Sequence, residues 1–181
     1  MKSLLPVIAL LLLVGCAGHR PGYPEDYRLA LAQTERAAAT DDAAIERFTD
    51  LYQNLKAPAL EERIAGVYAD DFYFSDTLHV FRNLPSLTTY MEATADRVES
   101  IEVDITRILR DGDDVWLIWD MRTHTRVLGR NMRADTIGMT HLRFNSEGRV
   151  VLHQDYWDSA EGLFIHIPLI GGLVRWTRNR L

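Results

Sequence analysis

The chain has 181 residues, a length that suits one domain better than two. Hydrophobic residues make up 47% and charged residues 25%, a balance typical of globular rather than disordered proteins. The formal net charge is −6 and no basic stripe follows the chain, so we expect no nucleic-acid partner.

The N-terminus is typical of an exported protein. Lys2 precedes an apolar run about as long as a signal-peptide core and too short to span a bilayer well. The run ends in "LVGC" at positions 13–16, which resembles the bacterial lipobox. The resemblance implies that residues 1–15 are a lipoprotein signal peptide and that Cys16 carries a lipid such as palmitate. An ordinary secretory signal with a chance cysteine is the alternative.

Cys16 is the only cysteine, so no intramolecular disulfide can form. Ala17 follows it, and in Gram-negative lipoproteins this resemblance implies the periplasmic face of the outer membrane. The segment after it, "AGHRPGYPEDY", holds two Pro and two Gly without an apolar period, which is typical of a linker. We therefore expect residues 16–40 to form a tether to the membrane, with a weak helix over the alanine-rich 29–39.

Three helices are predicted next. Asp41 or Asp42 can cap a helix whose apolar residues follow helical spacing to Leu55. Pro58 is placed to begin a second helix that runs to Tyr68. The stretch "LPSLTTYMEATADRVE" predicts the third.

The apolar period then changes to two. After a short strand or bend at "FYFSD", four strands are predicted over 101–109, 115–128, 132–145 and 149–158. Their short turns favour antiparallel meander connections. The predicted fold is α+β: three N-terminal helices against a strongly curved antiparallel sheet of four to six strands, forming a cone with an internal cavity over residues 41–181.

Two stretches carry a family resemblance. "VYADDFYFSD", and "THLRFNSEGRVVLHQDYWDS" near the end, resemble the nuclear transport factor two-like superfamily, and within it the SnoaL-like proteins and ketosteroid isomerase. The resemblance covers roughly residues 41–159 and implies a cone fold. It implies little about the reaction, because this fold carries both enzymes and pure binding proteins.

The isomerase resemblance extends to single positions. Its general-base aspartate corresponds to Asp76, and its oxyanion tyrosine corresponds to Tyr52 in an ungapped alignment. Its oxyanion acid corresponds to Thr140, whose hydroxyl is a far weaker acid than a neutral carboxyl group. The resemblance therefore does not extend to steroid isomerase activity.

SnoaL-like cyclases use an aspartate on the last strand, about where Asp155 falls. Strand alternation puts His153, Asp155 and Trp157 on one face, which the isomerase template points into the cone, with Thr140 across the hairpin. We take Asp76, Asp155, Tyr52 and His153 as candidate catalytic residues. The expected ligand cavity is lined by Thr140, Trp157, Trp119, Met121 and Leu142.

Each candidate also has a structural interpretation. Asp155 can be a carboxylate that anchors the last strand, Asp76 a turn residue, and Tyr52 a core residue of its helix. His124 and His141 are expected on the surface of their strands. The histidines show no metal-ligand spacing and the chain has no glycine-rich phosphate loop, so neither a metal nor another cofactor is expected.

The tail over 159–181 is apolar and then ends in three arginines. It either packs on the mouth of the cone, packs on a second subunit in a homodimer, or lies on a membrane surface. Three functions stay open: binding of a small apolar ligand, proton-transfer catalysis such as isomerisation, dehydration or epoxide opening, and an envelope interaction module with a filled core. A large cavity lined by both Asp76 and Asp155 would favour the enzyme.

Overall fold

The computed structural model describes residues 23–34, 40–127, 130–167 and 170–180. The expected signal peptide and Cys16 lie outside these ranges. Within them, no helix has both the length and the apolar character needed to cross a membrane.

Helices precede a long run of strands, as predicted, and further helices follow. The elements are α1 (Tyr23–Gln33), α2 (Asp42–Gln53), α3 (Leu60–Val67), β1 (Tyr68–Ser75), β2 (Val80–Phe81), α4 (Leu84–Arg97), β3 (Val98–Asp111), β4 (Asp114–Val127), β5 (Arg130–Phe144), β6 (Val150–Trp157), α5 (Ser159–Gly162), the 3-10 helix η1 (Phe164–His166) and α6 (Ile170–Arg178).

One six-stranded sheet has the order β2-β1-β6-β5-β4-β3. The predicted meander is confirmed, since β3, β4, β5 and β6 pair antiparallel in sequence order. The sheet as a whole is mixed because β1 lies parallel to the last strand, β6. Register shifts interrupt the β1–β6, β3–β4 and β5–β6 pairings, and such bulges increase the curvature of a sheet.

The three predicted helices are present with small changes in their bounds. The Asp41 side chain caps α2 by accepting a hydrogen bond from Ala43 N, and Asn83 caps α4 in the same way from Ser86 N. The second helix begins after Ala59, later than Pro58, and it ends at Val67, so that Tyr68 is the first residue of β1.

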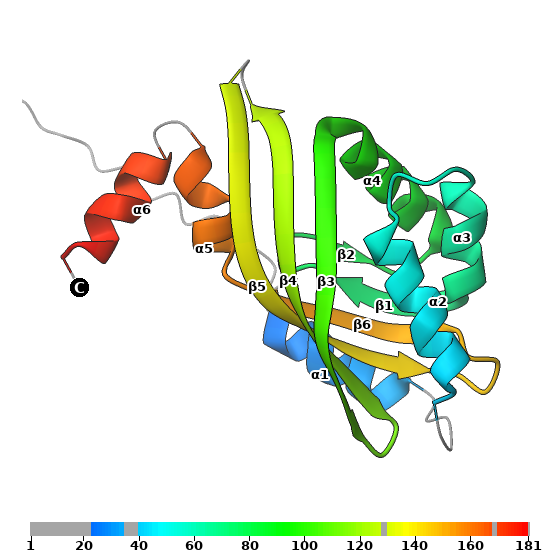
Figure 1. Ribbon diagram of the computed structural model, residues 1–181. Helices are drawn as coiled ribbons and strands as arrows, with labels where there is room; N and C mark the ends of the chain where they lie inside the picture. Colours follow the sequence, from blue (N-terminus) through cyan, green and yellow to red (C-terminus); the bar gives the residue numbers. More distant parts are fainter. Residues whose placement is uncertain (1–22, 35–39, 128–129, 168–169, 181) are drawn as a thin grey trace, which may run out of the picture.

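Helices α2 to α4 lie inside the curve of the long strands, which bend around them to form the expected cone (Figure 1). Buried residues of α2, α3 and α4 share one hydrophobic core with β1, β4, β5 and β6. The same core borders the cavity, because Phe48, Leu117 and Trp119 belong to both.

Helix α1 lies on the other side of the sheet, along β6 (Figure 1). Ala30 is buried there with Tyr73 and Leu152. A tether reaching Tyr27 and a weak helix over 29–39 were expected, whereas the helix covers 23–33 and packs on the sheet. The sequence hides this contact because the partners of α1 lie on strands far along the chain, as the 114-residue separation of Tyr27 and His141 illustrates.

The tail forms α5, η1 and α6. Helix α5 begins at Ser159, is capped by the Asp158 side chain and contacts β5. Gly162 and Leu163 line the cavity, so this part of the tail does pack at the cone. Helix α6 projects to one side (Figure 1) with Leu173 64% and Trp176 53% exposed. Its contact with a second subunit or a membrane stays a prediction.

Candidate functional site

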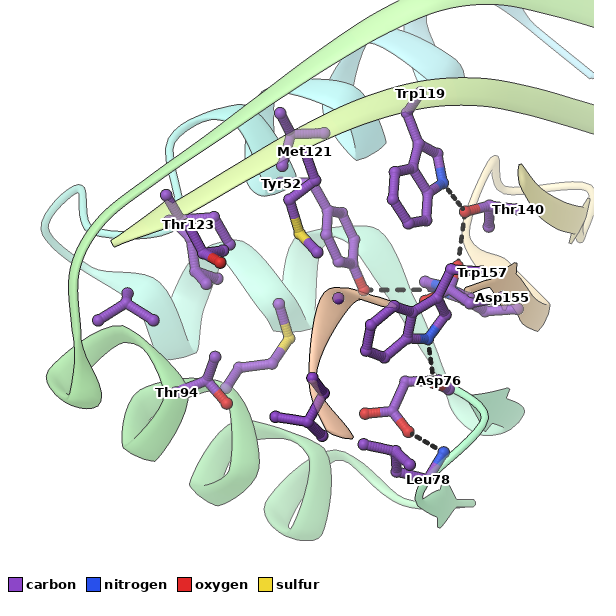
Figure 2. A pocket seen from close by; sticks show the side chains of 18 of the residues that line it. Tyr52, Asp76, Leu78, Thr94, Trp119, Met121, Thr123, Thr140, Asp155 and Trp157 are labelled. Atoms are coloured by element: carbon purple, nitrogen blue, oxygen red, sulfur yellow. Dashed lines mark hydrogen bonds and ion pairs between the residues drawn. The ribbon is translucent and has the colours of Figure 1, made fainter. Parts of the chain in front are cut away.

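A cavity of about 320 Å³ opens inside the cone. Its wall is mainly apolar and aromatic, with side chains from α2, α4, β1, β3, β4, β5, β6 and the start of the tail. This volume is at the lower end of the roughly 300–1,000 Å³ typical of ligand sites, so the cavity fits a small molecule. Asp76 and Asp155 both line it, and Figure 2 shows their carboxylates on the same side.

Strand β6 contributes one of the two carboxylates of the cavity, Asp155, and its neighbours. His153, Asp155 and Trp157 face inward, as predicted, while Leu152 and Gln154 face the α1 side. The alternation of a strand produces this arrangement, because residues two apart share a face.

The Asp155 carboxylate is held by one oxygen. Its Oδ1 accepts the Thr140 hydroxyl at 2.6 Å and is 2.8 Å from Nε2 of His153. Thr140 in turn accepts the indole N–H of Trp119 at 2.9 Å, a chain visible in Figure 2. Among the described residues, both hydrogen bonds to this carboxylate reach Oδ1, and Oδ2 is left for the cavity.

Two tyrosines continue this series of hydrogen bonds beyond His153. Tyr68 lies with its hydroxyl 2.6 Å from Nδ1 of His153, and the Tyr52 hydroxyl is 2.6 Å from that of Tyr68. When Asp155 is ionised it only accepts, so Nε2 donates to it; in a neutral His153 ring, Nδ1 then accepts from Tyr68 and Tyr68 accepts from Tyr52. With that tautomer, every donor in this series of hydrogen bonds points towards Asp155.

Both tyrosines stay protonated over the physiological range. Burial raises the pKa of Tyr52 well above its ordinary value, and the nearby Tyr68 and Asp155 raise it further. Burial also raises the pKa of Tyr68; the hydrogen bond with Tyr52 lowers it and the Asp155 charge raises it, with a net upward shift. The two hydroxyls therefore act as neutral hydrogen-bond donors.

Asp76 has a different environment, just after β1. Its Oδ1 accepts the backbone N–H groups of Leu78 and His79 at 2.9 and 2.7 Å. Its Oδ2 accepts the Tyr90 hydroxyl and is 3.3 Å from Nδ1 of His79. Burial, the Asp76 charge and this hydrogen bond raise the pKa of Tyr90. Both oxygens of Asp76 are thus engaged, as in a turn-forming aspartate.

The structure brings together all four candidate catalytic residues around this cavity, together with Thr140, Trp119, Met121 and Trp157. Leu142 is the exception: it is fully buried in the core and does not line the cavity. It shares the inward face of β5 with Thr140 but lies nearer the narrow end of the cone, where the helices cover it.

His141 was expected on the surface and is 2% exposed, because α1 covers it and Tyr27 contacts its ring. Tyr68 and Tyr90 contact the candidate residues directly, and neither was predicted to belong to the site. Tyr90 lies three positions after Leu87 in the third predicted helix, a spacing that puts both on one face and could have placed it inward. Tyr68 offered no such signal, because it was assigned to the end of a helix.

The cavity has no obvious place for a metal. Within the described ranges, no three His, Cys, Asp or Glu side chains lie close enough to hold one.

The arrangement around Asp155 is suited to moving a proton. Asp155 offers a free carboxylate oxygen, while His153 and Thr140 fix the other oxygen and Tyr68 and Tyr52 support His153.

Comparisons with known proteins agree with this architecture. The family model described as "SnoaL-like domain" matches residues 35–153. No curated protein matches the sequence. A structure named as a SnoaL-like polyketide cyclase from Jannaschia sp. CCS1 is 12% identical, with a TM-score of 0.56 over 72% of this chain and 99% of the other.

Two further similar structures have other names. An LEH-like epoxide hydrolase from M. tuberculosis is 22% identical, with a TM-score of 0.53 over 76% of this chain and 94% of the other. A hypothetical protein with a ketosteroid isomerase-like fold from Catenulispora acidiphila, in complex with trimethylamine, is 19% identical, with a TM-score of 0.53 over 69% and 92%. At these identities the likeness shows the shared fold.

Proposed function

The chain belongs to the SnoaL-like domain family, and we propose that it binds a small, mainly apolar molecule in its cone and transfers a proton to or from it. Asp155 is the general base or acid of this proposal. The observation that carries it is the Asp155 carboxylate, which has one oxygen fixed by His153 and Thr140 and the other free at an apolar cavity.

The geometry favours Asp155 over Asp76 as the proton-transfer group. A general base needs an oxygen that can approach the substrate proton within hydrogen-bond distance. Asp76 uses Oδ1 for two backbone N–H groups and Oδ2 for Tyr90. Asp155 keeps one oxygen available and has an ionisable neighbour, His153, with Nε2 2.8 Å from its other oxygen.

His153 and Tyr52 have supporting roles in the proposal. His153 holds the carboxylate by its Nε2 proton, and Tyr68 fixes the ring from behind. Tyr52 lines the cavity with a protonated hydroxyl that can turn from Tyr68 to a substrate oxygen. A polyketide cyclase and an epoxide hydrolase among the structural neighbours are compatible with an enzyme, while the proton transfer itself is proposed from Asp155.

A substrate-independent probe tests this proposal. In the Kemp elimination of 5-nitrobenzisoxazole, a base removes the proton from carbon 3 while the N–O bond breaks, which gives a nitrile and a coloured phenolate. The probe is neutral, small and apolar, as the cavity requires. We expect saturable turnover by the wild-type protein, and a loss of at least about 100-fold in Asp155→Asn.

Asp71→Asn is the matched control, because Asp71 is an exposed residue of β1 and the change in net charge is the same. Turnover in this variant should equal that of the wild type. Saturable binding of the probe with no Asp155-dependent turnover would refute the catalytic role and leave a binding protein. If the probe neither binds nor reacts, the proposed proton transfer fails and the envelope module is the better interpretation.

A lipid anchor at Cys16 also belongs to the proposal. It is supported by the lipobox-like "LVGC" and by the absence of any other cysteine in the sequence. In a Gram-negative host, the full-length protein should fractionate with membranes, and Cys16→Ser should release it or leave it unprocessed. Unchanged fractionation and unchanged mature mass in that variant would refute the anchor.

A further inference from the structure

The charges on the cavity wall are all of one sign. Among the described residues that line it, the carboxylates are Asp76 and Asp155, and none is a lysine or an arginine. An anionic ligand would therefore meet two carboxylates without a fixed positive partner, which is unfavourable in an apolar surrounding. On charge alone, the cavity therefore disfavours an anionic ligand.

Asp76 supplies a charge that the proposed proton transfer does not use. Its side chain is only 13% exposed, and its donors are two backbone N–H groups and the Tyr90 hydroxyl. This donor set matches an ionised carboxylate. The ring of His79 is the ionisable neighbour, but it is half-exposed and lies on the turn itself.

Two aromatic rings flank this carboxylate. Trp157 is fixed beside it, because its indole N–H donates to the Asp76 carbonyl oxygen at 2.8 Å, and Figure 2 shows the indole next to Asp76. Tyr90 is fixed by its hydrogen bond to the carboxylate. Both rings line the cavity, and Tyr52 lines it from α2. The faces of aromatic rings attract cations, and quaternary ammonium groups are recognised in such surroundings.

From this juxtaposition we propose that the molecule bound in the cone carries a cationic amine or ammonium group, held at Asp76 between Tyr90 and Trp157. The rest of the molecule is apolar and reaches towards Asp155. This inference rests on the ligand site of the proposed function but not on the proton transfer. A neutral ligand would fill the same space and leave the Asp76 charge with only its hydrogen-bond donors and the half-exposed His79 ring beside it, which is why the cation is favoured.

Choline and 3,3-dimethyl-1-butanol test the proposal, because they have the same shape and differ by the replacement of charged nitrogen by carbon. Binding to the full-length protein is measured by isothermal titration and by the fluorescence of the cavity tryptophans. We expect choline to bind at least tenfold more tightly than the alcohol. Equal affinities, tighter binding of the alcohol, or no binding of choline would overturn the proposal.

Asp76→Asn is the informative variant. The amide oxygen can still accept the N–H groups of Leu78 and His79, so the turn is preserved while the charge is lost. We expect the preference for choline to fall to about one, with a melting temperature close to wild type. Asp71→Asn should keep the preference, since it removes an exposed charge outside the cavity. A preference that survives in Asp76→Asn would also overturn the proposal.

The neutral 5-nitrobenzisoxazole separates this inference from the proposed function. Asp155-dependent turnover without any choline preference would refute the ammonium site alone. A choline preference that depends on Asp76, without Asp155-dependent turnover, would support the ammonium site and refute the proton transfer.

Discussion

Nε2 of His153 lies 2.8 Å from Oδ1 of Asp155, two positions along β6. The two side chains share the inward face of the strand and converge on one oxygen with the Thr140 hydroxyl, which comes from the paired position of β5. The carboxylate is thus held in one orientation by groups on two neighbouring strands. Such a preorganised base at an apolar cavity is what a proton-transfer enzyme needs.

Asp155→Asn should leave the fold intact. The amide oxygen of asparagine can accept the same two hydrogen bonds, while the replacement removes a charge from an apolar wall. We expect a melting temperature at pH 7 that is unchanged or higher, together with lost turnover, as is common when an active-site residue is replaced. A loss of about 1–3 kcal/mol with probe binding intact would instead indicate a structural carboxylate.

The buried tyrosines predict an alkaline limit of stability. Burial, with the nearby charge of Asp155, raises the pKa of Tyr52 and Tyr68 in the folded state. In the unfolded chain both ionise near pH 10, so the unfolded state releases protons first. The stability they contribute is present below about pH 10 and is lost as the pH rises further.

Thermal melts from pH 8 to 11 check this point. Tyr68→Phe should flatten the decline above about pH 10, because one raised pKa is removed. Tyrosine absorbance near 295 nm should show fewer ionising groups in the folded protein than in denaturant. Parallel declines in wild type and variant would contradict the assignment.

The residues of β6 that share a face and the pairing of Thr140 with Asp155 could be predicted from a period of two and short turns, while the resemblance to the isomerase implied which face is inward. Capping and proline placement also predicted where two helices begin: Asp41 caps α2, and Pro85 lies in the first turn of α4. These features depend on residues close together in the sequence, where spacing and capping are visible.

The remaining features depend on distant contacts. Pairing of β1 with β6 brings Tyr68 to His153 over 85 positions, and no local pattern announces it. His141 was predicted on the surface because nothing in the sequence near it shows that α1 covers it. Leu142 was predicted to line the cavity, and its burial in the core likewise depends on helices distant in the sequence.

The docking of α1 should weaken in acid. His141 lies between the Tyr27 hydroxyl and Asp114, at 2.7 Å from each, and Arg143 also contacts Asp114. Burial lowers the pKa of His141, although Asp114 opposes the shift. The unfolded chain then binds more protons below about pH 6.5, so the stability that neutral His141 contributes is lost as the pH falls from there through its lower folded pKa.

His141→Gln tests this dependence, since glutamine can bridge the same partners without titrating in this range. The variant should show a shallower loss of stability between about pH 6.5 and 4.5 than the wild type. Hydrogen exchange gives a local measure: the protection of α1 amides, relative to the intrinsic exchange rate at each pH, should fall on acidification in the wild type. Equal slopes and unchanged protection in α1 would show that His141 does not couple pH to this helix.

Gly138 leaves room for the Trp119 indole to lie over the neighbouring strand, β5. The two residues are paired on β4 and β5, and a Cβ at Gly138 would lie 2.3 Å from ring atoms Cζ2 and Cη2 of Trp119. The ring can therefore extend over Gly138 and donate its N–H to Thr140, the next residue on the same face of β5. The missing side chain at Gly138 therefore lets Trp119 reach the Thr140 hydroxyl, which in turn donates to Asp155.

Gly138→Ala should displace this indole, because the added methyl group meets the body of the ring rather than the end of a flexible side chain. We expect a loss of about 1–3 kcal/mol in the free energy of unfolding, a changed near-ultraviolet circular dichroism spectrum and slower Kemp elimination, since Thr140 loses its bond to Trp119.

Gly66→Ala is the control. Nothing lies within 4 Å of its added Cβ, and alanine favours helix α3 by about 0.5–1 kcal/mol, so stability should rise while turnover stays unchanged. If Gly138→Ala melts like the wild type and turns over the probe equally fast, the indole has room to move and its bond to Thr140 does not position Asp155.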